Sequence, residues 1–170
     1  LAVYKVLGET EAARRAGEKA LALNPYDTDI IGDFAAWLIS QGEGKRGYRM
    51  LRDAEDLFDA RPAWIEVFRF LSAWMIGKNE EANSIARFLD PARSPMVAAI
   101  VLMDAAVTDD GERAVEAAEQ LKRDDSDFLE EPRSNLARRG FALPVAEKMS
   151  ALIDEGKALA ERFKESSNPN

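Results

Sequence analysis

One short stretch of the sequence has glycines at the spacing of a dinucleotide-binding loop. Residues 42–47, Gly-Glu-Gly-Lys-Arg-Gly, match the pattern G-x-G-x-x-G. In that loop a strand precedes the glycines, and the following helix receives the pyrophosphate at its N-terminus. Residues 30–40 have helical and not strand periodicity. We therefore assign Gly42 to a turn between helices and Gly47 to a helix crossing, and we predict no cofactor.

The pair Gly44-Lys45 also resembles the end of a phosphate-binding loop. That loop requires a glycine five residues before Gly44 and a serine or threonine after the lysine. The chain has Ile39 and Arg46 at these positions. A phosphate cradle is therefore not predicted here.

An acidic cluster follows later in the chain, at Asp124, Asp125, Asp127, Glu130 and Glu131. A calcium loop starting at Asp125 would need an oxygen ligand at Leu129 and a glycine at Glu130. Neither condition is met, so we interpret the cluster as a solvated loop between helices and predict no metal site.

The composition excludes several kinds of chemistry. The 170 residues include no histidine and no cysteine, so no Ser-His-Asp or Cys-His constellation and no disulfide can form. The net charge of −8 disfavours binding to nucleic acid. We predict that this segment is not an enzyme, although a catalytic domain could precede residue 1.

Glycines recur at a fixed spacing along the chain. Gly8, Gly42, Gly77 and Gly111 are 34, 35 and 34 residues apart, and each follows an apolar stretch of helical periodicity. A period of this length is typical of stacked helical hairpins. We therefore predict an all-α protein built as a solenoid, in which each hairpin packs on its neighbours.

The predicted units divide the chain as follows. The repeats span residues 1–123, with a partial unit at about 1–25 and hairpins at 27–60, 62–89 and 95–123. Helices are expected at about 9–23, 28–41, 45–60, 62–76, 80–89, 95–107, 112–122 and 128–138. Residues 127–165 should form C-terminal capping helices, the last starting at Pro144, and 166–170 a frayed tail.

The period drifts in the last hairpin. Counting from Gly111 puts Glu116 where earlier units have Ala13, Gly47 and Ala82. A shift of two residues brings small and apolar residues, Ala114, Ala118 and Leu121, into register instead, and we prefer that alignment.

The pattern resembles the tetratricopeptide repeat, and this resemblance implies that the solenoid is a right-handed superhelix. The matching residues are Tyr4, Gly8, Ala13, Ala20 and Pro25 in the first unit, Phe34, Ala35, Leu38, Gly42, Gly47, Leu51 and Ala54 in the second, and Gly77, Ala82 and Ala86 in the third. Two positions depart from it. Ile31 replaces the expected tryptophan, and Asp59 replaces the terminal proline.

A finer resemblance concerns residues 20–27 and 138–144, which look like the C-terminal repeat segments of bacterial nucleotide cyclases or winged-helix transcriptional regulators. This resemblance implies that the chain is one module of a larger, cytoplasmic signalling or regulatory protein. It also implies that the effector domain lies upstream of residue 1.

An aromatic band marks the helix expected at residues 62–76. Trp64, Phe70, Trp74 and Met75 place apolar groups on more than one of its faces. In this repeat class the first helix of each hairpin lines the concave side. We therefore expect Ala36, Ile39 and Met103 to join the band in an apolar groove. Core packing of Trp64, Phe68, Leu71 and Trp74 between the units explains the band equally well.

The function predicted from the sequence is noncatalytic. The groove would hold a protein or peptide, or a second copy of the chain in a homodimer, with Trp64, Phe70, Trp74, Met75, Met103, Ile39 and Ala36 as contacts. The alternative is a sensor of a small apolar ligand, with a deep pocket under Trp74 and Met103. The longest apolar run, residues 96–103, is far below the ~20 residues that span a membrane.

Overall fold

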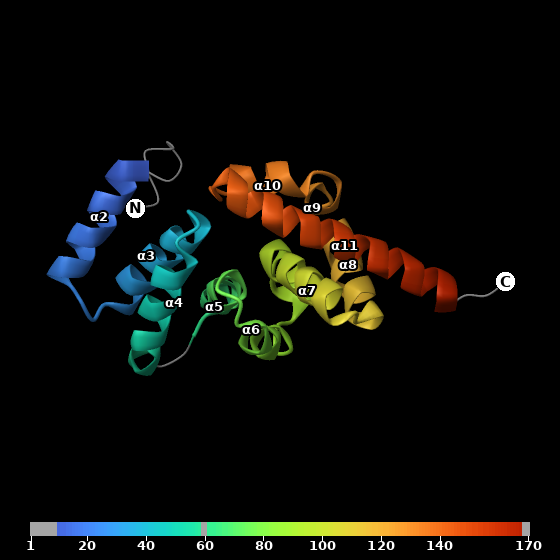
Figure 1. The fold of residues 1–170 in the computed structure, drawn as a ribbon, viewed down its shortest axis with the longest axis horizontal. Coiled ribbons are helices and arrows are strands. Elements are labelled where there is room, and N and C mark those ends of the chain that lie inside the picture. Colours follow the sequence, from blue (N-terminus) through green and yellow to red (C-terminus); the bar gives the residue numbers. More distant parts are fainter. Residues whose placement is uncertain (1–9, 59–60, 168–170) are drawn as a thin grey trace.

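The computed structural model describes residues 10–58 and 61–167, and within these ranges the chain is all-α (Figure 1). The helices are α2 (Thr10–Leu23), α3 (Thr28–Ser40), α4 (Gly44–Asp53), α5 (Ala63–Met75), α6 (Asn79–Ala86), α7 (Pro95–Thr108), α8 (Gly111–Asp124), α9 (Asp127–Glu130), α10 (Pro132–Arg138) and α11 (Leu143–Ser167). Two 3₁₀ turns, η1 (Glu55–Leu57) and η2 (Pro91–Arg93), lie in the connections.

Side-chain caps start several of these helices. The Asp27 carboxylate accepts hydrogen bonds from the backbone of Asp29 and Ile30 at the start of α3. Ser94 caps α7 and Asp110 caps α8 in the same way. Each cap satisfies amide groups that have no partner within the helix.

The first two hairpin turns depend on glycine. Gly42 has φ +95° and Gly77 has φ +78°, in the left-handed region that residues with a side chain rarely adopt. In the third hairpin the left-handed residue is Asp109, with φ 55°, and Gly111 is already the first residue of α8. Asp109 is therefore the counterpart of Gly42, and the predicted shift of two residues is confirmed.

Small residues allow the two helices of a hairpin to approach closely. A Cβ placed on Gly47 would lie 2.8 Å from Ile39 Cδ1 and 3.1 Å from the Ala35 carbonyl oxygen. Ala82 and Ala114 occupy the equivalent positions in the sequences of α6 and α8, and both are also buried. The predicted role of Gly47 at a helix crossing is thus confirmed.

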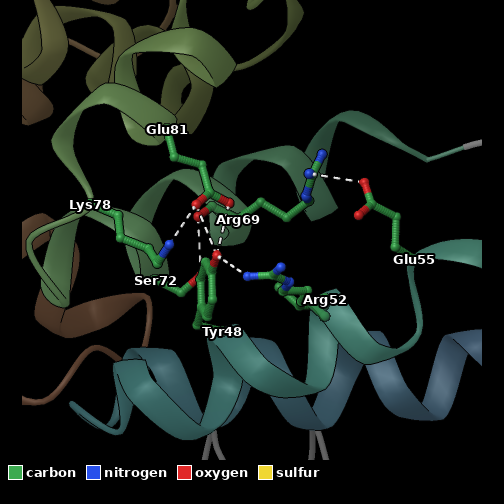
Figure 2. A pocket seen from close by; sticks show the side chains of 8 residues that line it. Tyr48, Arg52, Glu55, Arg69, Ser72, Lys78 and Glu81 are labelled. Carbon is green, nitrogen blue, oxygen red and sulfur yellow. Dashed lines mark hydrogen bonds and ion pairs between the residues drawn. The ribbon is translucent and has the colours of Figure 1, made fainter.

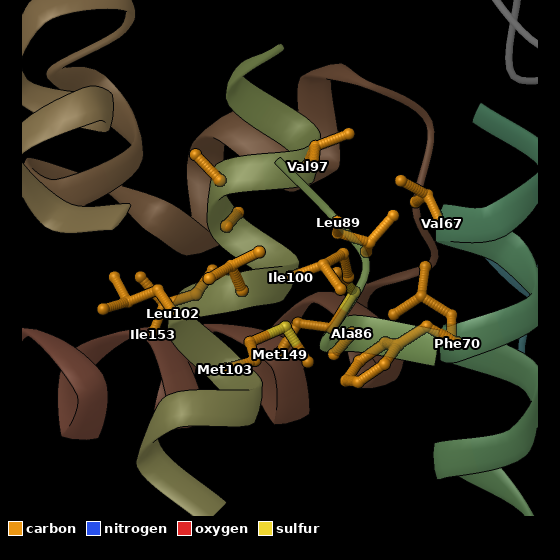
Figure 3. Packing of buried hydrophobic residues seen from close by; sticks show 14 of the residues in the cluster. Val67, Phe70, Ala86, Leu89, Val97, Ile100, Leu102, Met103, Met149 and Ile153 are labelled. Atoms are coloured by element: carbon orange, nitrogen blue, oxygen red, sulfur yellow. The ribbon is translucent and has the colours of Figure 1, made fainter. Parts of the chain in front are cut away.

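Successive hairpins pack on one another along the chain. The α3–α4 pair contacts α5, and the α5–α6 pair contacts α7. The first helices of neighbouring hairpins also touch, α3 with α5 and α5 with α7. α7 lies at the centre of the largest core cluster, and every residue from Val97 to Ala105 is buried. Figure 3 shows side chains of α5, α6 and α11 converging on this helix.

The C-terminal segment covers more than the last hairpin. α11 packs along α7 and α8, and it comes so close that a Cβ on Gly156 would lie 2.5 Å from the Leu102 carbonyl oxygen. The loop before α11 reaches back to α3, where the Ala142 amide donates to the Ser40 carbonyl at 2.9 Å. The predicted groove along the first helices of the hairpins is therefore not open over its whole length, because the C-terminal segment lies against α7 and the end of α3.

Several predicted boundaries need correction. α4 ends at Asp53 and not at residue 60, and Glu55 of η1 then pairs with Arg69 of α5 at 3.2 Å. The helix expected at 128–138 is two helices, because Pro132 disfavours helical backbone in the residue before it. α11 continues to Ser167, into the predicted tail. The predictions for Tyr4, Gly8 and Asp59 lie outside the described residues.

Candidate functional site

Four of the seven predicted contact residues belong to the core. Ile39, Phe70 and Met103 are buried, as is Ala36. Met103 lies beside Met149 of α11 in Figure 3. The side of α7 expected to face the groove is therefore covered by the C-terminal helix. These four side chains therefore offer no surface to a partner. Met103 cannot line the predicted deep pocket, because its exposed fraction is 0%.

Trp64 lies in the first turn of α5, where it is 39% exposed. Its ring packs on Gly32 of α3, since a Cβ there would lie 2.8 Å from Trp64 Cη2. Its accessible edge is thus separate from Trp74, which is at the other end of the same helix.

Trp74 and Met75 are half-buried and line a cleft of about 540 Å³. We call it the Trp74 cleft. Its lining consists of Gly42, Gly44, Lys45, Trp74, Met75, Ile76, Pro144, Val145 and Lys148. The residues come from the start of α4, the end of α5 and the start of α11. Three elements far apart in the sequence therefore build it together.

Two glycines line this cleft for different reasons. A Cβ on Gly44 would lie 2.8 Å from Met75 Cβ, so α4 can start directly against α5 only with glycine there. At Gly42 a Cβ would lie 3.6 Å from Val145 Cγ2, an ordinary contact distance, so glycine is required there by its φ of +95° and not by the approach of α11. Both glycines belong to the nucleotide-binding-like stretch, and the segment before them is helix α3, as predicted.

The charge around the Trp74 cleft is positive. Lys45 and Lys148 line it and are exposed, and no aspartate or glutamate is among the lining residues. The neighbouring carboxylates are paired elsewhere. Glu43 bonds to Arg14 and lies 3.7 Å from Arg46, and Glu147 lies 3.4 Å from Arg133.

A second cleft, of about 390 Å³, lies between α4, α5 and α6 (Figure 2). We call it the polar cleft. It is lined by Tyr48, Leu51, Arg52, Glu55, Arg69, Ser72, Lys78 and Glu81. No pattern in the sequence indicates it, because its charged residues are spread over three helices and a turn with no common spacing.

Most polar groups of this cleft are bonded to one another. The Tyr48 hydroxyl donates to Glu81 Oε2 at 2.8 Å, and Lys78 Nζ lies 3.5 Å from the same oxygen. On the other side Arg69 pairs with Glu55 at 3.2 Å. A hydrogen bond from Arg61, together with the charges of the nearby arginines, lowers the pKa of Glu55. This network ties α4, η1, α5 and α6 together.

One titratable group is buried near these helices. Asp104 of α7 is 5% exposed, and burial raises its pKa from 3.8 to about 6, although Arg113 and Arg87 act in the opposite direction. With its amide oriented to meet acceptors, Asn83 of α6 donates to Asp104 Oδ1 at 2.8 Å. Asp104 lines none of the clefts described above.

Within the described part of the chain, no three Asp or Glu side chains come together as a metal site would require. None of the helices described combines the length and the apolar character needed to cross a membrane. The comparisons with protein-family models, curated proteins and solved structures found no match to this chain. Function must therefore be inferred from the two clefts and from the packing around them.

Proposed function

We propose that this chain is a noncatalytic interaction module that binds a segment of a protein partner in the Trp74 cleft. The observation that carries the proposal is the position of Trp74 and Met75. They are the predicted contact residues that remain half-buried over a cleft while most of the others fill the core. Tryptophan is among the residues that contribute most to binding energy at interfaces, and methionine is enriched in them.

The architecture supports the same proposal. Three consecutive hairpins, α3–α4, α5–α6 and α7–α8, each contact the next, and glycine or alanine lies at each crossing. This is the packing expected of a tetratricopeptide-like, right-handed solenoid with α11 as its cap. Such a module would serve a larger bacterial signalling or regulatory protein in the cytoplasm.

A small apolar ligand is the second candidate for the same cleft. Its volume of about 540 Å³ lies in the range of small-molecule sites. A ligand that binds only the folded chain would raise the melting temperature with its concentration. We favour a protein segment because the half-buried Trp74 and Met75 lie beside the exposed Lys45 and Lys148, a combination of apolar centre and polar rim that is typical of protein interfaces.

Selection of random peptides displayed on phage, with the purified chain as bait, tests the proposal. We expect peptides whose binding weakens about tenfold or more in Trp74→Ala, because a central aromatic anchor is lost. Phe88→Ala is the matched control, since Phe88 is 89% exposed and lines none of the clefts described here.

Circular dichroism would show whether the variants remain folded, and Trp74→Leu replaces Trp74→Ala if the latter does not. The proposal is wrong if all selected peptides bind the folded Trp74 variant as tightly as the wild type. Light scattering of the same samples would detect self-association. A dimer that dissociates in the Trp74 variant would make a second copy the occupant of the cleft.

A further inference from the structure

We infer that the partner segment is acidic: an apolar side chain enters the Trp74 cleft, and carboxylates beside it pair with Lys45 and Lys148. This inference rests on the proposed function and specifies the chemistry of the partner at the same site. It follows from the distribution of charge around the cleft.

The charge of the cleft lining differs from that of the whole chain. The chain has 31 acidic and 23 basic residues, yet the cleft lining contains two lysines and no carboxylate. A positive rim on an acidic protein attracts negatively charged groups and repels positively charged ones.

The two lysines have no bonding partner within the described part of the chain. Among the described residues, neither Lys45 nor Lys148 forms an ion pair or a side-chain hydrogen bond. The lysine of the polar cleft differs, because Lys78 lies 3.5 Å from Glu81 and its ammonium is 5.3 Å from the Tyr48 ring centroid. The fold therefore uses Lys78 and leaves Lys45 and Lys148 for a ligand.

The acidic residues close to these lysines in the sequence are already paired. Glu43 directly precedes Gly44 and is held by Arg14 and Arg46, and Glu147 directly precedes Lys148 and is paired with Arg133. Each lysine thus has an acidic neighbour in sequence whose charge is already compensated by an arginine. The positive charge at the rim remains uncompensated.

The apolar floor determines what the rest of the partner must be. Trp74, Met75, Ile76 and Val145 provide the apolar lining. A long acyl chain would need a site that buries most of its surface, whereas one or two peptide side chains fit in a surface cleft. A peptide with an apolar anchor and flanking Asp or Glu satisfies both requirements.

The expected contribution of charge is moderate. Exposed lysine–carboxylate pairs change affinity by roughly twofold to fivefold each, and salt screens them. Replacing both lysines with glutamate reverses their charge and adds repulsion. We therefore expect the double variant Lys45→Glu/Lys148→Glu to bind acidic peptides about tenfold or more weakly than the wild type.

Peptide selection on three proteins tests this inference: the wild type, Lys45→Glu/Lys148→Glu, and the control Lys19→Glu/Lys122→Glu. Lys19 and Lys122 are exposed and outside the Trp74 cleft, and their reversal changes the net charge by the same amount. We expect wild type and control to select peptides with Asp or Glu beside an apolar residue. The cleft variant should lose this preference.

The outcomes separate the inference from the proposed function. If the selected peptides depend on Trp74 but are neutral or basic, the cleft binds peptides and the acidic partner is wrong. If no peptide depends on Trp74, the proposed function fails and the inference fails with it. Dodecanoate is added as a competitor to test whether the cleft binds a fatty acid instead of a peptide. Dodecanoate that binds the wild type but not the cleft variant, with no Trp74-dependent peptide, would assign the cleft to a fatty acid.

Discussion

The polar cleft and the Trp74 cleft lie on the same hairpins, and they differ in what their side chains already contact. In the polar cleft Tyr48, Glu81 and Lys78 are bonded to one another, and Arg69 to Glu55. In the Trp74 cleft the two lysines have no such partners among the described residues. Charged residues alone therefore do not mark a binding site. A charge left without a partner beside apolar surface is the more informative observation.

The two clefts also differ in how they depend on the C-terminal helix. α4, η1, α5 and α6 form the polar cleft, whereas Pro144, Val145 and Lys148 of α11 form one wall of the Trp74 cleft. The binding surface would then exist only while α11 is docked. Variants in α11, α7 and the polar cleft can show which of these parts the stability of the chain and the binding of peptides require.

The largest effect is expected for Gly156→Val. A Cβ at this position would lie 2.5 Å from the Leu102 carbonyl oxygen, a backbone atom that cannot move aside without shifting α7. We expect a loss of about 3 kcal/mol in the free energy of unfolding, measured with urea. Peptide binding to the Trp74 cleft should fall as well. A variant as stable as the wild type would show that α11 does not pack on α7 in this way.

Asp104→Asn should act on stability and leave both clefts unchanged. Because the pKa of Asp104 is raised from 3.8 to about 6, the folded chain binds more protons than the unfolded chain between these pH values. The contribution of Asp104 to stability therefore falls as the pH rises through this window.

Asparagine carries no charge at any pH, so the variant should be more stable at pH 7 by on the order of 2 kcal/mol. Thermal unfolding of both proteins between about pH 4 and pH 7 measures the difference. The two curves should converge toward pH 4. A constant difference across the whole range would mean that Asp104 is not the titrating group.

Tyr48→Phe gives the smallest effect and concerns the polar cleft alone. It removes the hydrogen bond from the Tyr48 hydroxyl to Glu81 at 2.8 Å and should cost about 1 kcal/mol of stability. Binding of the selected peptides should not change. If peptide affinity falls in this variant and not in Trp74→Ala, the polar cleft is the binding site.

Much of the fold could be predicted because its signals are local. Gly42 and Gly77 turn the chain, and a small residue lies at each hairpin crossing. The third hairpin was harder, since Asp109 takes the left-handed position and Gly111 has another role. The shift of register was nevertheless visible in Ala114.

The path of α11 could not be predicted, because it depends on contacts between residues far apart in the chain. The Ala142–Ser40 hydrogen bond is an example, and so is the approach of Gly156 to Leu102. One signal was present in the sequence. Residues 97–103 are apolar on all faces, which indicates a helix that is covered on every side. The same cover explains why Met103 belongs to the core.

The three tryptophans allow the most direct test of the central claim, that the partner binds in the Trp74 cleft. Trp37 is buried, Trp64 lies on Gly32, and Trp74 lines the cleft. Their indole N–H signals can be followed by NMR during titration with a selected acidic peptide and assigned with single Trp→Phe variants. Our account predicts that the Trp74 signal shifts while those of Trp37 and Trp64 remain in place. A shift confined to Trp64, or no shift at saturating peptide, would contradict it.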